Sequence, residues 1–195
     1  MSDQLTASSG PPPGAPHAPA VPAPGAAARP DWRGALLQAV VVVVGFAVAG
    51  AICGLIWEAL WSPAPGAVVK HVWYPLSWDR AQPAAFAGTG WFVVVSIVAG
   101  ALLGALAAWR LDRAELVTLA AVAVGGVLAA YLMREVGLHR SPADPQHLAK
   151  TAADGTRLPS SLRLSSWGVL AAFPGAGLAG LAIILLTVSK RVNTD

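Results

Sequence analysis

Residues 91–133 read WFVVVSIVAGALLGALAAWRLDRAELVTLAAVAVGGVLAAYLM, a long apolar run that only the charged residues of 110–115 interrupt. A helix needs about 20 apolar residues to cross a hydrocarbon core of roughly 30 Å. The stretch therefore predicts a transmembrane hairpin, with helices over about 91–109 and 116–133 and a tight turn between them.

Two further windows of similar length and composition flank this hairpin, at about 34–57 and 167–188. The whole chain has 55% hydrophobic and only 12% charged residues, a composition that suits lipid better than water. Because the apolar runs do not alternate with polar residues, they do not fit the strands of a membrane β-barrel. The sequence predicts an all-α membrane protein with four transmembrane helices.

The four spans belong to a predicted transmembrane domain of residues 31–191. The preceding residues, 1–30, are rich in proline, alanine and glycine and have little apolar surface to bury. We expect them to form a disordered cytoplasmic tail. The two long loops, at about 58–90 and 134–166, are expected on the opposite side of the membrane from both termini.

The long loops contain signals for a small extracytoplasmic cap. Residues 68–74 resemble a short strand, with prolines that predict turns on both sides of it, up to Pro83. Asp144 followed by proline predicts the start of a short helix over about 145–153. The extended pattern of 156–164 is expected to pair with the first strand and complete the cap.

Small residues predict where the transmembrane helices approach one another. Two GxxxG pairs and one glycine doublet lie in the first three spans, at Gly50, Gly54, Gly100, Gly104, Gly125 and Gly126. In lipid, such residues let neighbouring helix backbones come close. We expect the two helices of the hairpin to pack against each other through their own glycines, and Pro174 to kink the fourth span.

Positive charges close to the membrane predict the orientation. The flanks on the side of the termini carry Arg29, Arg33, Arg110, Arg113, Lys190 and Arg191. The immediate flanks of the long loops contribute essentially Arg134 and Arg163. Both termini are therefore expected in the cytoplasm, with the protein in the cell membrane. Tryptophans fit two interfacial belts, with Trp32 and Trp109 on the inner side and Trp57, Trp61, Trp91 and Trp167 on the outer side.

Sequence motifs for catalysis and metal binding are missing. The chain has no G-x-S-x-G elbow, no H-E-x-x-H and no phosphate-binding loop. Its single cysteine, Cys53, rules out an internal disulfide. The loop histidines His71, His139 and His147 lack the spacing of a zinc motif. Because the basic residues are scattered, nucleic acid is not expected as a partner. We predict no catalytic residue, no metal and no cofactor, and expect a protein that is not an enzyme.

Three charged residues near the predicted outer ends of the helices form the candidate site. Glu58 lies between two tryptophans at the end of the first span, and Arg134 and Glu135 end the third span. Together they would line an outer polar vestibule. The alternative is structural: Glu58 would pair with Arg134 or be solvated among headgroups, and the other two would cap a helix end.

Several short motifs occur along residues 35–190, at 88–92, 100–104, 125–126, 131–137, 153–156, 162–164 and 169–174. With four spans around them, the chain resembles a family of actinobacterial four-helix membrane proteins catalogued as a domain of unknown function. The resemblance implies a lineage and a topology. It supplies no catalytic residues.

Two functions of different classes remain open at this stage. The first is a non-enzymatic structural or interaction component of the cell envelope, whose partners would be the bilayer and either another copy of the chain or an envelope protein. The second is a small transporter or channel component that uses the outer polar vestibule. An enzyme of the outer leaflet would require His71, His139 and a carboxylate to converge.

Overall fold

The computed structural model describes residues 32–110, 115–164 and 166–192. The predicted tail and the tight turn of the hairpin, at 111–114, lie outside the described residues. The elements in chain order are α1 (Trp32–Leu60), β1 (Pro65–Val69), β2 (Val72–Pro75), α2 (Trp78–Arg110), α3 (Glu115–Arg140), α4 (Pro145–Ala149), β3 (Arg157–Pro159), the 3-10 helix η1 (Trp167–Ala171) and α5 (Ala172–Val192).

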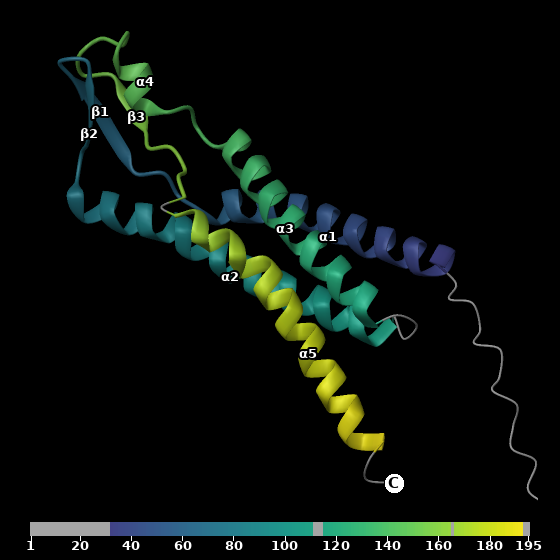
Figure 1. Ribbon diagram of the computed structural model, residues 1–195. Coiled ribbons are helices and arrows are strands. Elements are labelled where there is room, and N and C mark those ends of the chain that lie inside the picture. Colours follow the sequence, from purple (N-terminus) through teal and green to yellow (C-terminus); the bar gives the residue numbers. More distant parts are fainter. Residues whose placement is uncertain (1–31, 111–114, 165, 193–195) are drawn as a thin grey trace, which may run out of the picture. The chain divides into compact units, whose positions relative to one another are not determined.

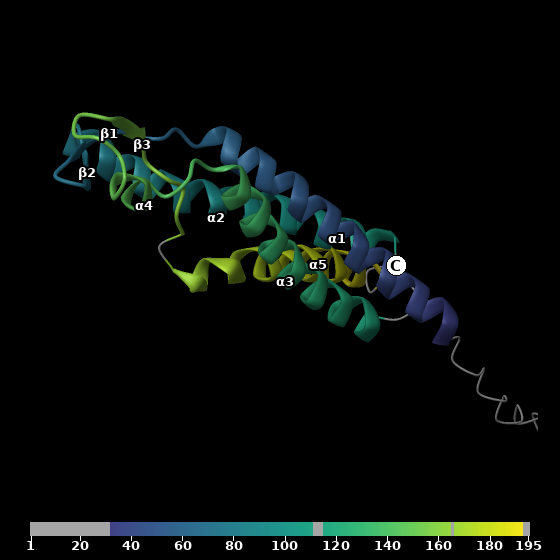
Figure 2. The same ribbon diagram turned by 90° about the horizontal axis from the view of Figure 1, so that it is seen from above.

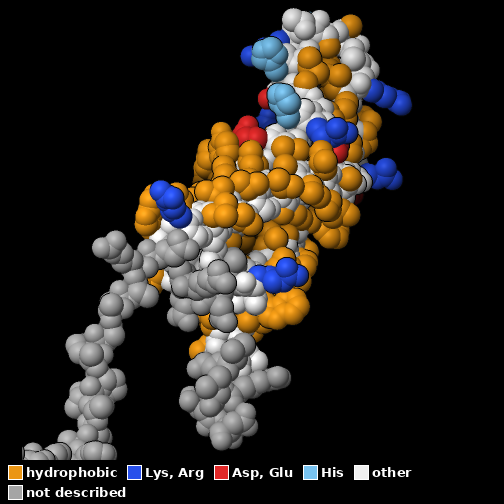
Figure 3. Space-filling view, turned by 90° about the vertical axis from the view of Figure 1, so that its right-hand side faces the viewer, with side chains coloured by type: hydrophobic (Ala, Val, Ile, Leu, Met, Phe, Trp, Pro, Cys, Tyr) orange, Lys and Arg blue, Asp and Glu red, His pale blue; other side chains and the backbone are white. Residues whose placement is uncertain are grey.

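Four of the described helices, α1, α2, α3 and α5, are long and apolar enough to cross a membrane. Figure 1 shows the strands and α4 gathered at one end of these helices. In Figure 3, charged side chains and histidines lie at the cap end, a few more Lys and Arg lie toward the opposite end, and hydrophobic side chains cover the surface between them. This distribution is typical of a membrane protein, and it confirms the predicted fold class of four apolar helices with a small cap.

The helix α2 begins earlier than predicted. It starts at Trp78, thirteen residues before the expected span, and has 33 residues, which corresponds to about 50 Å. Pro83 lies inside this helix, where a turn was predicted. Proline removes the hydrogen bond to the carbonyl four residues earlier. That carbonyl belongs to Asp79, which is exposed together with Pro83, so water or headgroups can satisfy it.

The glycine pairs lie at contacts between helices, and the sequence did not predict which helices these would be. α1 packs mainly on α3, and α2 packs mainly on α5. A Cβ on Gly54 would lie 2.7 Å from the carbonyl oxygen of Met133, and a Cβ on Gly50 would overlap the backbone of Ala129. The glycines of the hairpin were expected to bring its two helices close together, but each of them contacts α1 or α5 instead, because a small-residue stripe indicates close approach without identifying the partner.

The pairing of α2 with α5 rests on the same kind of contact. A Cβ on Gly100 would lie 2.6 Å from the carbonyl oxygen of Phe173, and a Cβ on Gly104 would overlap the carbonyl of Gly177. These distances are shorter than any real Cβ contact, so the two backbones can meet only at glycine.

The doublet in α3 joins the two helix pairs. Gly125 lies against the side chain of Phe46 in α1, and Gly126 lies against the backbone of Pro174 in α5. The rings of Phe46 and Phe173 are 6.1 Å apart, and both are buried. The bundle therefore has one continuous core.

The fourth span consists of η1 followed by α5. Pro174 is the third residue of α5, in the first turn, where a missing N–H breaks no interior hydrogen bond. The helix type changes from 3-10 to α at Ala172, two residues before Pro174, where a kink was expected.

The cap is a three-stranded antiparallel sheet in the order β2-β1-β3, with α4 beside it. Residues predicted as one strand form a hairpin instead, because Lys70 and His71 have φ of 51° and 63° and reverse the chain. The predicted pairing with the segment after Gly155 is confirmed, since β1 pairs with β3. α4 begins after Asp144, whose side chain accepts a hydrogen bond from the N–H of Gln146, as predicted, and ends earlier than expected.

Candidate functional site

A cavity of about 770 Å³ lies between the cap and the first turns of α2. Its walls come from Trp61 and Ala64, which follow α1, from β2, from the stretch 78–85 of α2, from α4 and from the segment 160–164. Figure 2 shows the sheet and α4 beside the beginning of α2. This is the size of a site for a small organic ligand.

Four aromatic side chains line this cavity: Trp61, Trp73, Tyr74 and Trp78. The indole N–H of Trp61 donates to the carbonyl of Ala84 at 3.0 Å, and that of Trp73 donates to the carbonyl of Leu158 at 3.0 Å. Both polar atoms are therefore occupied within the protein, and the rings offer apolar surface to the cavity.

Trp73 is fixed from the side of the sheet as well. A Cβ on Gly66, in the neighbouring strand β1, would overlap the Trp73 ring. The ring thus lies directly over the β1 backbone, held at its edge by the hydrogen bond to Leu158. A wall built in this way is rigid before any ligand arrives, which lowers the entropy lost on binding.

Among the described residues that line the cavity, Arg163 is the one that carries a charge. Its Nη2 lies 2.7 Å from a carboxylate oxygen of Asp144, and its Nε donates to Ser161 Oγ at 3.3 Å. Asp144 is itself held as the N-cap of α4. The guanidinium is therefore positioned by two partners, and its remaining donors can meet a ligand.

A second cavity of about 230 Å³ lies beside the first and shares Arg163 and Leu164 with it. Arg134 and Trp167 are also among its lining residues. The Arg134 guanidinium lies over the Trp167 ring, 5.0 Å from its centroid, and also pairs with Glu135. Trp167 itself is largely exposed.

In the structure, the three predicted vestibule residues do not form one cluster of contacts. Glu58 lies 3.8 Å from Nε of Arg140, so its cation partner is Arg140 where Arg134 was the predicted alternative. Arg134 and Glu135 contact each other. Of the three, only Arg134 lines either of the two cavities described above.

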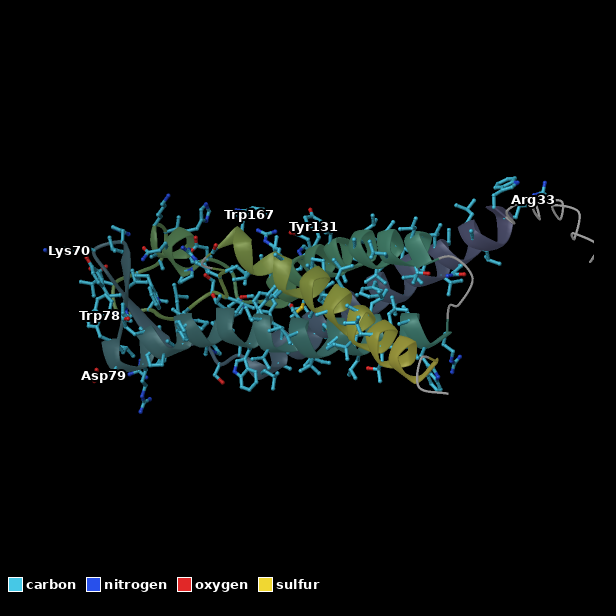
Figure 4. All side chains as sticks on the ribbon, turned by 60° about the horizontal axis from the view of Figure 1, so that its bottom comes forward. Arg33, Lys70, Trp78, Asp79, Tyr131 and Trp167 are labelled. Atoms are coloured by element: carbon cyan, nitrogen blue, oxygen red, sulfur yellow. The ribbon has the colours of Figure 1, made fainter. Side chains whose placement is uncertain are left out.

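Two tryptophans assigned to the outer belt lie in the core. Trp57 is fully buried and Trp61 is 8% exposed, because their indole N–H groups reach backbone carbonyls of α2. Trp32, Trp91, Trp109 and Trp167 are exposed, as interfacial anchors would be. Figure 4 shows Trp78, with Asp79 and Lys70, at the cap end and Arg33 at the opposite end.

The loop histidines do not gather into a metal site. His71 lies in the hairpin turn, His139 in the last turn of α3 and His147 in α4. Among the residues that the structure describes, no three His, Cys, Asp or Glu side chains are close enough to hold a metal ion together. Cys53 is a free and buried thiol.

Sequence reasoning missed the cavity, because its walls come from segments that are distant in the chain. One signal was present: Trp57, Trp61, Trp73 and Trp78 are half of the eight tryptophans and fall within 22 residues. No protein-family model matches the chain, and no matching chain was found among curated proteins or solved structures.

Proposed function

We propose that this membrane protein is a non-enzymatic binding component of the cytoplasmic membrane, with both termini in the cytoplasm and the cap on the outer side. It would act by binding a component of the envelope, or another copy of the chain, through the cap. The observation that carries this proposal is the preformed cavity of about 770 Å³ between the cap and α2.

The transmembrane part supports a scaffolding role. Its helices meet backbone to backbone at Gly50, Gly104 and Gly126, which leaves no room for a side chain at these three positions. The buried polar side chains Ser96 and Thr118 have partners on other helices, Met133 and Gln38. Transport sites are usually built from polar groups and broken helices near the midplane, and these contacts instead favour a rigid support for the cap.

The orientation can be tested by cysteine labelling, since Cys53 is the only native thiol and is buried. A membrane-impermeant maleimide should label Lys70→Cys in intact cells. It should label Thr194→Cys only after the membrane is permeabilised, and wild-type protein provides the background. The reverse pattern would refute the proposed orientation.

The interaction can be tested by cross-linking in native membranes. A bifunctional reagent attached at His71→Cys, in the exposed hairpin turn, should give products larger than the monomer. The same reagent at Thr194→Cys serves as the matched control on the opposite side. Recovery of monomer alone from the cap position, with unchanged envelope properties after gene deletion, would argue against the proposal.

The transporter hypothesis makes a different prediction for the same protein. Liposomes that contain it should conduct or exchange a solute, and Glu58→Gln should reduce that flux. Absence of any solute-dependent flux would argue against it. The contact between Glu58 and Arg140 gives the control, because Arg140→Gln disrupts the same pair without removing the carboxylate.

The resemblance to the actinobacterial four-helix family stays a prediction about lineage. It requires that chains sharing the Gly88–Phe92 and Ala153–Thr156 stretches also carry four apolar spans. Related chains with these stretches in a soluble context would contradict it.

A further inference from the structure

We infer that the cap cavity binds an anionic phospholipid of the outer leaflet, with the phosphate of its headgroup on Arg163 and its apolar part against the aromatic walls. This inference rests on the proposed function, because it requires the cap to lie on the outer side of the membrane. It adds the chemical class of the ligand.

The depth of the cavity favours a ligand that comes from the membrane. The predicted apolar run of α1 ends at Trp57. Trp61 lies four residues farther on, and four residues span about 6 Å along a helix. Its indole N–H meets the carbonyl of Ala84, so Ala84 in α2 lies at the same level. The headgroup layer extends roughly 5 to 8 Å beyond the hydrocarbon core. With the hydrocarbon boundary at Trp57, as the sequence predicts, the cavity-lining residues Trp61 and Ala84 lie at headgroup depth.

The walls of the cavity suit an amphiphile. Rings of Trp61, Trp73 and Trp78 and the small side chains of Ala84 and Ala85 supply apolar surface. Beyond the cavity, Phe86 is 81% exposed, one residue along α2 from Ala85. Phe86 follows the cavity-lining Gln82 by four residues, so the two lie next to each other on one face of α2. Exposed apolar surface therefore lies beside the cavity, and a molecule with one polar and one apolar end can contact both regions at once.

The charge of the lining favours an anion. Arg163 contributes a cation, and the described lining residues include no Asp or Glu. Asp144, its ion-pair partner, is not among them. A guanidinium is well suited to phosphate, because its planar donors match two phosphate oxygens. The pair with Asp144 and the bond to Ser161 aim the guanidinium, and Nη1 has no partner among the described residues.

The test is lipid retention measured by native mass spectrometry of the full chain released from bilayers of phosphatidylglycerol and phosphatidylcholine. Wild-type protein should retain phosphatidylglycerol in preference. Arg163→Gln should weaken that retention by about tenfold, the effect of losing one charge-assisted hydrogen bond. Arg157→Gln is the matched control, since Arg157 is exposed in β3 and lines neither cavity.

A second pair of variants tests the location independently of charge. Ala85→Phe places a ring inside the cavity and should displace the lipid. Ala59→Phe makes the same change on the exposed side of α1, outside both cavities, and should leave retention unchanged.

A third variant separates recognition from folding. Asp144→Asn keeps an N-cap side chain for α4 and a side-chain oxygen that can still accept a hydrogen bond from Arg163 and position it, but removes the negative charge that competes with the phosphate. If Arg163 acts on the lipid, retention of phosphatidylglycerol should rise. If Arg163 only holds the cap together, Asp144→Asn should resemble Arg163→Gln, and the inference would be overturned.

Two further outcomes would also overturn it. One is equal retention by Arg163→Gln and Arg157→Gln. The other is displacement of the lipid by millimolar glycerol phosphate or inorganic phosphate, which would assign the cavity to a ligand from solution. Labelling of Lys70→Cys from outside tests the orientation separately, so a correctly placed cap without bound lipid would refute this inference and leave the proposed function standing.

Discussion

The indole N–H of Trp57 donates a 2.6 Å hydrogen bond to the carbonyl oxygen of Gly88, and both residues are buried. The Trp57 ring meets Phe92 edge to face, with centroids 5.0 Å apart. On α3, a Cβ at Gly137 would overlap the same ring. One side chain of α1 therefore contacts both α2 and α3 directly beneath the cap.

Trp57→Phe should destabilise the protein by about 2 kcal/mol, because it leaves the Gly88 carbonyl unpaired in a buried position and removes part of a packed ring. The measurement is unfolding by SDS in mixed micelles. Trp109→Phe is the control, since Trp109 is 74% exposed and its replacement should change stability by less than about 0.5 kcal/mol. Equal shifts for the two variants would show that the Trp57 contacts contribute little.

Gly104→Leu should separate α2 from α5, because its side chain would have to occupy the position of the Gly177 carbonyl. We expect a loss of about 3 kcal/mol or more, the upper range for overpacking. Gly90→Leu is the matched control in the same helix, since a Cβ there meets nothing within 4 Å. Thermal unfolding in detergent measures both variants, and similar melting temperatures would contradict the backbone contact.

The spans were predictable and their partners were not. The thickness of a bilayer fixes the length of an apolar run, so the four windows follow directly from composition. A GxxxG pair, in contrast, says only that a backbone comes close. The partner of Gly104 is Gly177, 73 residues later, and the match depends on the helix positions that the other contacts impose.

The cavity could not be predicted for a related reason. Pro83 suggested a loop, yet it lies on the exposed side of α2 where a missing hydrogen bond is tolerated. Arg163 had the sequence context of a membrane flank, and its role at the cavity depends on Asp144, which approaches from α4. The strand prediction located the right residues but missed the reversal at Lys70, because Lys70-His71 lacks the Asn-Gly or Asp-Gly pair that marks a two-residue hairpin turn.

Replacing Lys70-His71 by Asn-Gly should stabilise the cap by about 1 kcal/mol. Both residues have positive φ, which Asn and Gly adopt with less strain in a two-residue hairpin turn. Hydrogen exchange of the β1 and β2 amides should slow accordingly. Gly155→Ala should act in the opposite sense, because Gly155 also has positive φ and alanine is strained there. Unchanged exchange in both variants would mean that these turns do not limit opening of the sheet.

The hydrogen bond between Gln38 and Thr118 allows a measurement of how much such a bond between transmembrane helices contributes to the stability of this bundle. Gln38 Nε2 donates to Thr118 Oγ1 at 2.7 Å, which links α1 to α3 at the end far from the cap. A double-mutant cycle of Gln38→Leu and Thr118→Val should give a coupling energy of about 0.6 kcal/mol, the usual value for such bonds in membranes. Thr187→Val is the control, because among the described residues Thr187 bonds to the carbonyl of Ile183 in its own helix, and the change should be close to neutral. If the two changes are simply additive, the bond contributes nothing measurable, and the packing of α1 on α3, which includes Gly50 on Ala129 and Trp57 on Gly137, would hold this helix pair together without it.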